Sequence, residues 1–287
     1  MPAGGSPEAP LAILCGAGAF PLAVAEEVRR TGRPVFLIGI LGSSDPAIEH
    51  HPHAWARLGQ FGRLVELARG AGARDIVFVG ALSRPAGWLE LRPDRRLLML
   101  VPRLLRALRG GDDHLLRAVV GAVAEHGLQV RGVHEVAPGL MLPAGPLGQR
   151  TALDTDTADA VLGFRVLAAM SPFDVGQGAV IANGRVVAVE AAEGTDAMLV
   201  RVAELRASGR LRLPARAGVF VKAAKAGQDL RMDTPAIGPK TVESARAAGL
   251  AGIAYAAGDV MAVDAERMIA SADAAGLFIQ GYERERA

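Results

Sequence analysis

The stretch LAILCGAGAFPLAVA, residues 11–25, contains the pattern that decides the fold. Its first five residues are all apolar, as in a strand that is buried on both faces of a sheet. The turn Gly16-Ala17-Gly18 follows at once, and FPLAVAEEVRRTG (20–32) then repeats apolar side chains at helical spacing. A strand, a glycine turn and a helix in this order predict the opening unit of a parallel α/β sheet.

The same alternation continues through the first half of the chain. Further strands are predicted at PVFLIGI (34–40), DIVFVG (75–80) and LQVRGVHEV (128–136), and further helices at FGRLVELARGAG (61–72) and HLLRAVVGAVAEHG (114–127). Strands that alternate with helices of these lengths indicate βαβ units. We therefore expect an α/β protein whose residues 1–136 form a Rossmann-like domain with a parallel sheet.

The pattern lapses after this domain. PGLMLPAGPLGQ (138–149) holds three prolines and three glycines, which favours a linker over residues 137–157. Beyond it, two β-rich runs flank Asn183-Gly184, a strong hairpin signal, and short strands then alternate with helices. Residues 158–287 are therefore expected to form a distinct, smaller and mixed α/β domain that carries the catalytic residues.

Composition restricts the function. The chain has 287 residues, a hydrophobic fraction of 51% and a net charge of +2 with interspersed signs. No basic stripe is present for duplex binding, and 4% aromatic residues are too few for a stacking platform, so nucleic acid is not expected as a partner. The N-terminus shows no signal peptide and no apolar run long enough to span a bilayer, which predicts a soluble cytoplasmic protein.

Two groups in the first half are candidates for phosphate binding. Gly16, Ala17 and Gly18 open a helix, where backbone N–H groups can hold a phosphate. Pro21 replaces the third glycine of the dinucleotide fingerprint, so the turn suits a nucleotide diphosphate better than NAD. Tight strand–helix packing is the alternative reading. The second group, Gly80, Ser83 and Arg84, follows another strand, and Arg84 can equally be a solvated loop charge.

The segment EAAEGTD (190–196) carries carboxylates at the end of the predicted hairpin. Glu193 and Asp196 lie beside a turn into a helix, where acidic residues also serve the helix dipole. Glu190 instead ends an apolar strand, and burial of an unpaired carboxylate costs several kcal/mol. Glu190 should therefore have a partner, which is a cation, a lysine or a metal.

The segment FVKAAKAGQDLRMDTPAIGP (220–239) combines cations and carboxylates in a loop after a strand. Its candidates are Lys222, Lys225, Gln228, Asp229, Arg231 and Asp233. Such a mixture fits a pyrophosphate with Mg²⁺, because one or two carboxylates hold the ion together with substrate phosphates while cations neutralise charge. A surface loop with ion pairs is the alternative.

Two further features are less specific. His50, His51 and His53 surround a proline and have no spaced carboxylate, so they are expected to be loop residues. RRLLMLVPRLLRALRGG (95–111) is basic and apolar. It can rest on an anionic membrane surface, fringe an acyl chain groove, or simply pack in the core.

With these residues in view, the chain resembles the LpxI-type UDP-2,3-diacylglucosamine pyrophosphatases of lipid A synthesis over essentially its whole length beyond the first ten residues. The markers are GAGAFPLAVAE, LGQFGRL, SRPAGWLELRPD, GDDHLLRAVV, DVGQGAVIANGRVVAVEAAEGTDAML, VKAAKAGQDLRMDTPAIGPKTVE and AGLFIQG. Gln177 and Thr195 lie within the fifth marker and join the substrate-binding candidates.

The resemblance implies a Mg²⁺-assisted cleavage of UDP-2,3-diacylglucosamine into UMP and lipid X at the cytoplasmic face of the inner membrane, with the substrate held between the two domains. It implies an essential carboxylate in QDLRMD, which is Asp229 or Asp233. A homodimer is one assembly state that the sequence allows. We expect catalytic roles for Asp229, Asp233, Lys225 and Arg231, substrate binding by Lys222 and Gln228, and metal binding by Asp229, Asp233, Glu190, Glu193 and Asp196.

Two other functions compete with this expectation. A nucleotide-binding oxidoreductase can use the same sheet, although the missing third glycine and the missing ribose carboxylate count against it. A non-catalytic ligand-binding module would use the carboxylates only structurally. The last histidine is His134, so water in the second half would be activated by a carboxylate or by the metal itself.

Overall fold

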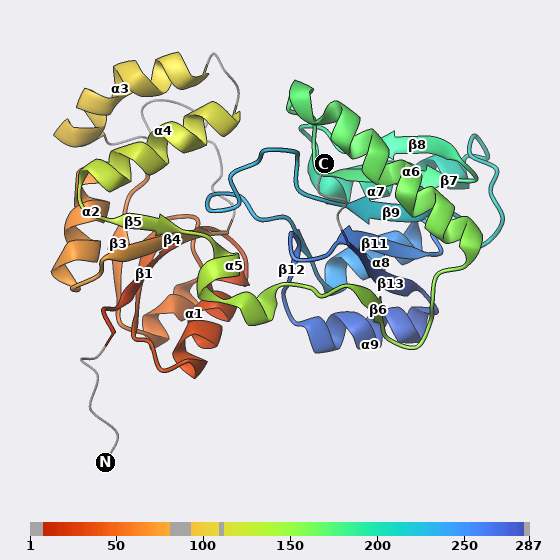
Figure 1. Cartoon of the computed structure of the whole chain (residues 1–287), viewed down its shortest axis with the longest axis horizontal. Helices are drawn as coiled ribbons and strands as arrows, with labels where there is room; N and C mark the ends of the chain where they lie inside the picture. Colours follow the sequence, from red (N-terminus) through yellow and green to blue (C-terminus); the bar gives the residue numbers. More distant parts are fainter. Residues whose placement is uncertain (1–7, 81–92, 109–111, 284–287) are drawn as a thin grey trace. The chain divides into compact units, whose positions relative to one another are not determined.

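The computed structural model describes residues 8–80, 93–108 and 112–283. The chain divides into two compact units, and each is treated by itself (Figure 1). The first unit comprises Met1–Gly139 together with Asp229–Asp233, and the second comprises Leu140–Gln228 together with Thr234–Ala287. Both units contain strands and helices, so the predicted α/β class is confirmed.

The first unit contains a parallel five-stranded sheet in the order β3-β2-β1-β4-β5. Its strands are β1 (Leu11–Cys15), β2 (Val35–Ile40), β3 (His53–Ala56), β4 (Asp75–Val79) and β5 (Gln129–Arg131). All five residues of β1 are buried, as expected for a central strand covered on both faces. This order matches the first five positions of the 3-2-1-4-5-6 order of doubly wound nucleotide-binding sheets.

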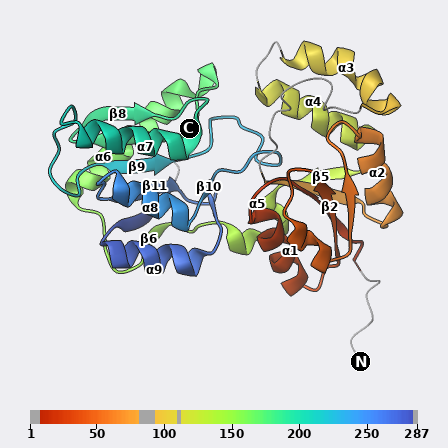
Figure 2. The same ribbon diagram turned by 180° about the vertical axis from the view of Figure 1, so that it is seen from behind.

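Helices cover both faces of this sheet. They are α1 (Phe20–Arg30), α2 (Phe61–Gly70), α3 (Arg95–Leu108), α4 (Asp112–Glu125) and α5 (Val133–Val136), with a short 3₁₀ helix η1 (Pro46–His50). One face packs on α1, and the other packs its apolar side chains on α2 and α4. Helix α3 packs on α2 and α4, and both views show it beside α4 and away from α1 (Figures 1 and 2).

The structure differs from the sequence prediction at two strands. The predicted strand over residues 128–136 ends at Arg131, because Glu135 Oε1 accepts a hydrogen bond from Gly132 N at 2.8 Å and starts helix α5. Strand β3 contains His53, which was expected in a loop. Its pairing with β2 supplies backbone hydrogen bonds that local sequence patterns do not reveal.

The second unit contains a six-stranded mixed sheet in the order β6-β13-β11-β9-β7-β8. Its strands are β6 (Gly145–Leu147), β7 (Gly178–Ala182), β8 (Arg185–Val189), β9 (Val219–Lys222), β11 (Gly252–Ala256) and β13 (Phe278–Tyr282). Strands β9, β11 and β13 are parallel, and the other pairings are antiparallel. A small additional sheet pairs β10 (Ala236–Ile237) with β12 (Met261–Ala262).

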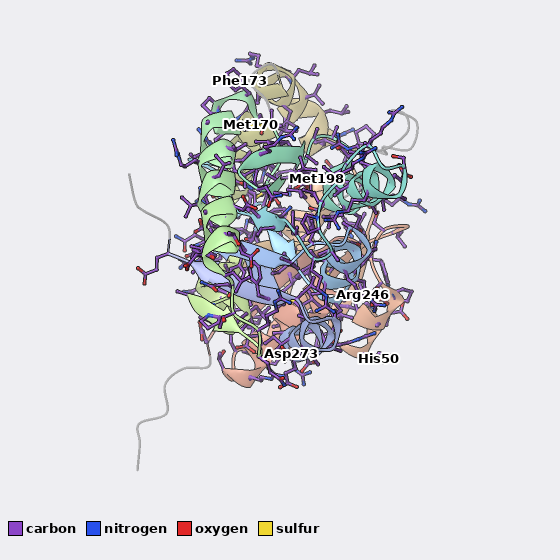
Figure 3. All side chains as sticks on the ribbon, turned by 90° about the vertical axis from the view of Figure 1, so that its right-hand side faces the viewer. His50, Met170, Phe173, Met198, Arg246 and Asp273 are labelled. Atoms are coloured by element: carbon purple, nitrogen blue, oxygen red, sulfur yellow. The ribbon has the colours of Figure 1, made fainter. Side chains whose placement is uncertain are left out.

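The helices of the second unit lie on both faces of its sheet. They are α6 (Asp154–Met170), α7 (Gly194–Ala207), α8 (Pro239–Ala247) and α9 (Ala265–Ala275), with 3₁₀ helices η2 (Pro138–Leu140), at the boundary between the units, and η3 (Ser171–Phe173). Figure 3 shows α6 on one side and α7, α8 and α9, marked by Met198, Arg246 and Asp273, on the other.

The hairpin predicted at Asn183-Gly184 joins β7 to β8. Both residues have positive φ, 52° and 71°, as a two-residue type I′ turn requires. The buried Asp159 of α6 accepts hydrogen bonds from Asn183 N at 2.9 Å and Gly184 N at 2.7 Å. The segment predicted as a linker is structured in part, since it contains the edge strand β6 and the first turn of α6.

Candidate functional site

The glycine turns of the first unit lie together at the carboxyl ends of β1 and β4. Gly16 N donates a hydrogen bond to Val79 O at 2.7 Å. Gly80 has a φ of +93°, and a Cβ placed there would lie 2.7 Å from Ala17 O, so only glycine fits this approach. Gly16, Ala17 and Gly80 are thus brought together, as the strand order predicts.

Helix α1 begins directly after this turn. Its N-cap residue Ala19 provides no side-chain hydrogen bond, so the first backbone N–H groups of the helix have no protein acceptor from the cap. Such a helix start suits an anion. Gly18 precedes it with a φ of +93°. The predicted Ser83 and Arg84 lie outside the described residues.

Ser44 is a component of this edge that the sequence did not reveal. Its hydroxyl donates to Cys15 O at 2.5 Å and accepts from Ile40 N at 2.7 Å, which ties together the ends of β1 and β2. The neighbouring Cys15 is buried, and burial raises the pKa of its thiol to about 12. Cys15 is therefore an unreactive core residue, as a thiol in an apolar strand should be.

A buried polar cluster occupies the second unit at the end of β9. Lys222 is only 5% exposed, and its Nζ donates to Glu190 Oε2 at 2.9 Å and to Thr195 Oγ1 at 2.8 Å. Glu190 follows β8, and Thr195 lies in the first turn of α7. The prediction that Glu190 must have a charged partner is confirmed, and the partner is Lys222.

Two glycines make room for Glu190. A Cβ at Gly178 would lie 2.5 Å from Glu190 Oε2, and a Cβ at Gly176 would lie 2.4 Å from Glu190 O. Between them, Gln177 accepts a hydrogen bond from Ala223 N through its backbone oxygen at 3.0 Å. The segment Gly176-Gln177-Gly178 is therefore part of the cluster around Glu190, a role that its sequence alone did not disclose.

The other predicted carboxylates of the second unit are paired with separate cations. Glu193 Oε1 accepts from Arg201 Nη2 at 2.8 Å, and Asp196 Oδ2 lies 2.5 Å from Lys240 Nζ. Lys225 forms an ion pair with Asp174, and its backbone N donates to Gln228 Oε1 at 2.9 Å.

The segment Asp229–Asp233 belongs to the first unit. Arg231 holds Asp229 through two parallel hydrogen bonds, from Nε to Oδ1 at 2.9 Å and from Nη2 to Oδ2 at 2.7 Å. Met232 packs against the core of this unit. Arg231 also lines a hollow of about 650 Å³ together with Asp75 and Gln129. The segment thus lies beside the edge strand β5, whereas the glycine turns follow the central strands β1 and β4.

The pKa of the Asp229 carboxyl lies below its ordinary value, first because of the side-chain hydrogen bonds from Arg231. Burial opposes this shift, and the more distant positive charge of Arg117 adds to it. Asp229 is therefore an anion throughout the neutral range. The same pairing raises the pKa of Arg231.

The carboxylates that were expected to bind Mg²⁺ lie at separate places in the described structure. Among residues 8–80, 93–108 and 112–283, no group of three or more His, Cys, Asp or Glu side chains is placed to hold an ion. Glu190, Glu193, Asp196 and Asp229 each face a cation instead. These residues fit only a cation such as Mg²⁺ that takes most of its ligands from substrate phosphates and water.

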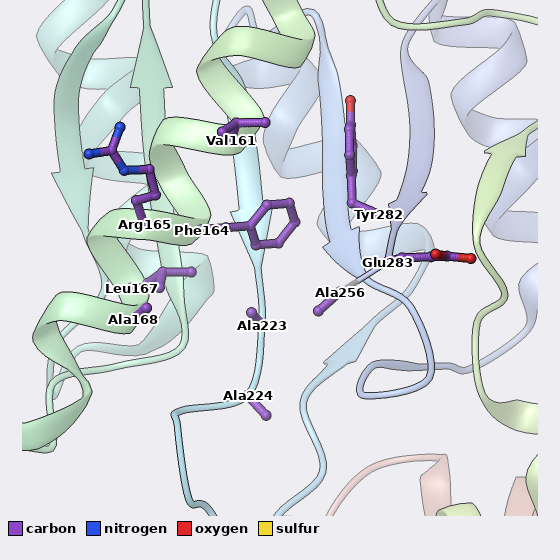
Figure 4. A pocket seen from close by; sticks show the side chains of 10 residues that line it. All are labelled: Val161, Phe164, Arg165, Leu167, Ala168, Ala223, Ala224, Ala256, Tyr282 and Glu283. Atoms are coloured by element: carbon purple, nitrogen blue, oxygen red, sulfur yellow. The ribbon is translucent and has the colours of Figure 1, made fainter. Parts of the chain in front are cut away.

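An apolar pocket of about 300 Å³ lies between α6 and the ends of β9, β11 and β13 in the second unit. Figure 4 shows Phe164 and Tyr282 beside it, and their ring centroids are 5.7 Å apart. Ala223 and Ala224, which directly follow Lys222, form part of its wall.

The geometry defines a class of protein: an α/β protein with a parallel sheet ordered as in nucleotide-binding proteins, together with a buried lysine–glutamate pair. Residues 10–140 match the LpxI N-terminal domain, and residues 143–280 match the LpxI C-terminal domain. The chain therefore belongs to the LpxI family.

A curated relative agrees with this assignment. The chain is 40% identical over 273 residues to UDP-2,3-diacylglucosamine pyrophosphatase LpxI of Caulobacter vibrioides, covering 95% of this chain and 97% of the relative. A solved structure, a GalE-like L-threonine dehydrogenase from Cupriavidus necator, is 13% identical and covers 96% of both chains with a TM-score of 0.29. This structural likeness is too low to inform the function.

The buried pair predicts a large effect of Lys222 on stability. Lys222→Met should lower the free energy of unfolding by about 3–5 kcal/mol, because it leaves Glu190 charged, buried and without its cation. The double variant Lys222→Met/Glu190→Gln should recover most of this loss. Urea unfolding measures both. Lys240→Met is the matched control, since it breaks an exposed pair and should cost about 1 kcal/mol or less. Equal losses from Lys222→Met and Lys240→Met would contradict the assignment.

The pairing of Asp229 predicts a second outcome. Arg231→Ala should raise the pKa of Asp229 towards its usual value of about 3.9, as followed by NMR titration of the carboxyl carbon. Because the native pKa is lowered, the pair stabilises the fold above the unfolded-state pKa, and this contribution is lost as pH falls through the native value. Arg117→Ala should give a smaller shift. An unchanged pKa in Arg231→Ala would refute the pairing.

Proposed function

We propose that the chain hydrolyses the pyrophosphate of UDP-2,3-diacylglucosamine to UMP and 2,3-diacylglucosamine 1-phosphate, lipid X, in lipid A biosynthesis. The observation that carries this proposal is the near full-length match to the LpxI family and to a relative named for this activity. The arrangement of charged groups is compatible with it, since lysines and arginines are present to bind a diphosphate.

The reaction adds water across one phosphoanhydride. A water oxygen bonds to a phosphorus of the diphosphate, the bridging P–O bond breaks, and two phosphate monoesters leave while the protons of water pass to solvent or to a carboxylate. We assign Asp229 and Asp233 as the catalytic carboxylates. Asp229 is anionic at neutral pH and can orient a water molecule.

Cations of this chain are proposed to bind the diphosphate. Lys222, Lys225 and Arg231 are each paired with a carboxylate, so a phosphate oxygen can replace that partner without leaving the cation unpaired. The proposed binding set also includes Gly16, Ala17, Gly18, Gly80, Ser83, Arg84, Gln177, Thr195 and Gln228.

Mg²⁺ is proposed as the cofactor, with Asp229, Asp233, Glu190, Glu193 and Asp196 as the candidate carboxylates. When bound, it would neutralise charge on the phosphate oxygens. Four of these carboxylates, Glu190, Glu193, Asp196 and Asp229, have a cationic partner that they would exchange for the ion, so the affinity of the protein for Mg²⁺ should depend on bound substrate.

The activity is tested with the full chain and UDP-2,3-diacylglucosamine in the presence of Mg²⁺. UMP and lipid X should appear in equal amounts by chromatography, and EDTA should abolish their formation. Absence of UMP would refute the proposal. A titration with NADH tests the oxidoreductase alternative. An oxidoreductase should bind NADH saturably, whereas the proposed hydrolase does not need to bind it.

The carboxylate assignment is tested by Asp229→Asn and Asp233→Asn. At least one should lower kcat by about 10²–10⁴-fold, the usual contribution of a positioned acid–base group, while circular dichroism shows that the protein stays folded. Asp154→Asn, at an exposed position in the first turn of α6, should leave kcat unchanged. Wild-type turnover in both of the first two variants would remove these residues from the site.

We further propose a cytoplasmic location with peripheral attachment to the inner membrane. None of the helices in the described part of the chain has the length and apolar character needed to cross a bilayer. Helix α3 exposes Met99, at 79%, beside Arg95 and Arg106, a combination that favours an anionic lipid surface.

The membrane proposal predicts co-sedimentation with phosphatidylglycerol vesicles at low salt. Met99→Glu should weaken binding, because it places a negative charge against an anionic surface. Phe173→Glu is the matched control, since Phe173 is exposed to a similar extent, at 77%, and belongs to η3 rather than α3. Equal weakening by both variants would contradict the role of α3.

A further inference from the structure

The first unit contains an apolar pocket of about 430 Å³ that the proposed chemistry has not used. It lies between the helix pair α3–α4, helix α2 and the sheet. Its volume falls within the range of small-molecule sites. It is larger than the apolar pocket of about 300 Å³ in the second unit.

The pocket forms because the start of α3 is attached to the start of α2. Asp94 Oδ1 accepts from Leu97 N at 2.8 Å, and Asp94 Oδ2 accepts from Gly62 N at 2.5 Å, so one carboxylate holds the starts of both α3 and α2. Helix α3 then packs on α2 and α4. Its inward side chains Leu97, Val101 and Leu104 face the pocket.

The chemistry of the wall restricts the ligand. Of the seventeen described residues that line the pocket, only Arg57 and Gln60 have polar side chains. Gln60 Oε1 already accepts a hydrogen bond from Arg57 N at 2.9 Å. A polar ligand needs a few placed donors and acceptors for its orientation, whereas a hydrocarbon chain needs none.

The position of the pocket relates it to the glycine turns. Leu14 and Phe78 form part of its wall, and they lie two residues before Gly16 and Gly80 on β1 and β4. Because a strand rises about 3.3 Å per residue, Leu14 and Phe78 lie within about 7 Å of these glycines along the chain. A ligand whose phosphate lies at the glycine turn therefore has hydrocarbon-lined space close by in the same unit.

We propose that this pocket binds an acyl chain of the lipid-linked nucleotide. The identity of the ligand rests on the proposed function, whereas the existence of an acyl site does not. Leu97, Val101 and Leu104 of α3 form the outer wall, and Leu14 and Phe78 form the sheet side. Each methylene buried there should strengthen binding about fourfold, as transfer of hydrocarbon from water does.

The experiment measures binding of the fluorescent fatty acid cis-parinaric acid to the full chain without bilayers. Wild type should bind one equivalent, and Leu97→Trp, which fills the pocket, should weaken binding at least tenfold. Leu98→Trp is the matched control, because the neighbouring Leu98 is 55% exposed and does not line the pocket. Val161→Trp, in the pocket of the second unit, should also bind normally.

A second variant that fills the pocket, Val101→Phe, makes the test independent of whether Leu97→Trp folds. A melting curve shows whether each variant is folded. Loss of binding in Val161→Trp with normal binding in both α3 variants would assign the acyl site to the second unit and overturn the proposal. Equal weakening by Leu97→Trp and Leu98→Trp would overturn it as well.

Displacement of the probe identifies the ligand. UDP-2,3-diacylglucosamine should displace cis-parinaric acid, and UDP-N-acetylglucosamine, which has only a two-carbon acyl group, should not. Failure of the diacyl nucleotide to displace the probe would refute its role as ligand. If displacement occurs but no UMP forms with Mg²⁺, the proposed hydrolysis fails while the acyl site stands.

Discussion

The structure of the second unit depends on the neutralisation of one buried charge, the ammonium group of Lys222. A cation withdrawn from water loses several kcal/mol of hydration, which is tolerated only when an anion and further hydrogen-bond partners replace the water. Glu190 and Thr195 do so from the end of β8 and the start of α7. This pairing therefore fixes the ends of β8 and β9 and the first turn of α7 relative to one another. It also explains why position 178 is a glycine, because any side chain there would displace the carboxylate of Glu190.

In the first unit, the corresponding constraint is steric. The chain leaves β1 and β4 at the same edge of the sheet, and the two exits approach so closely that a Cβ on Gly80 would meet the backbone of Ala17. Parallel sheets bind ligands at this edge because the strands end there and helices begin there with unpaired N–H groups. The close approach of Gly80 to Ala17 and the uncapped start of α1 both result from the short turn that connects β1 to α1.

Charge pairing also has a consequence for the proposed activity. Arg231 holds Asp229, and Lys225 holds Asp174, so the cations that we propose to bind a diphosphate are already held in place by carboxylates. Binding then exchanges one anion for another, which costs less than moving a solvated side chain into the site. The pocket beneath α3 is proposed to bind the apolar part of a lipid-linked nucleotide, which requires both charged and apolar surface.

Local patterns in the sequence were sufficient for the strand–turn–helix opening, the hairpin at Asn183-Gly184 and the requirement that Glu190 be paired, because each depends on neighbouring residues or on the burial of one strand. They did not reveal that the partner of Glu190 is Lys222, 32 residues away, nor that Asp229–Asp233 packs with the first unit through Met232. They also did not reveal strand β3, the glycine segment Gly176-Gln177-Gly178 around Glu190 or the extent of the pocket behind α3. Only tertiary structure decided these, because partner choice depends on contacts between segments remote in sequence, about which periodicity carries no information.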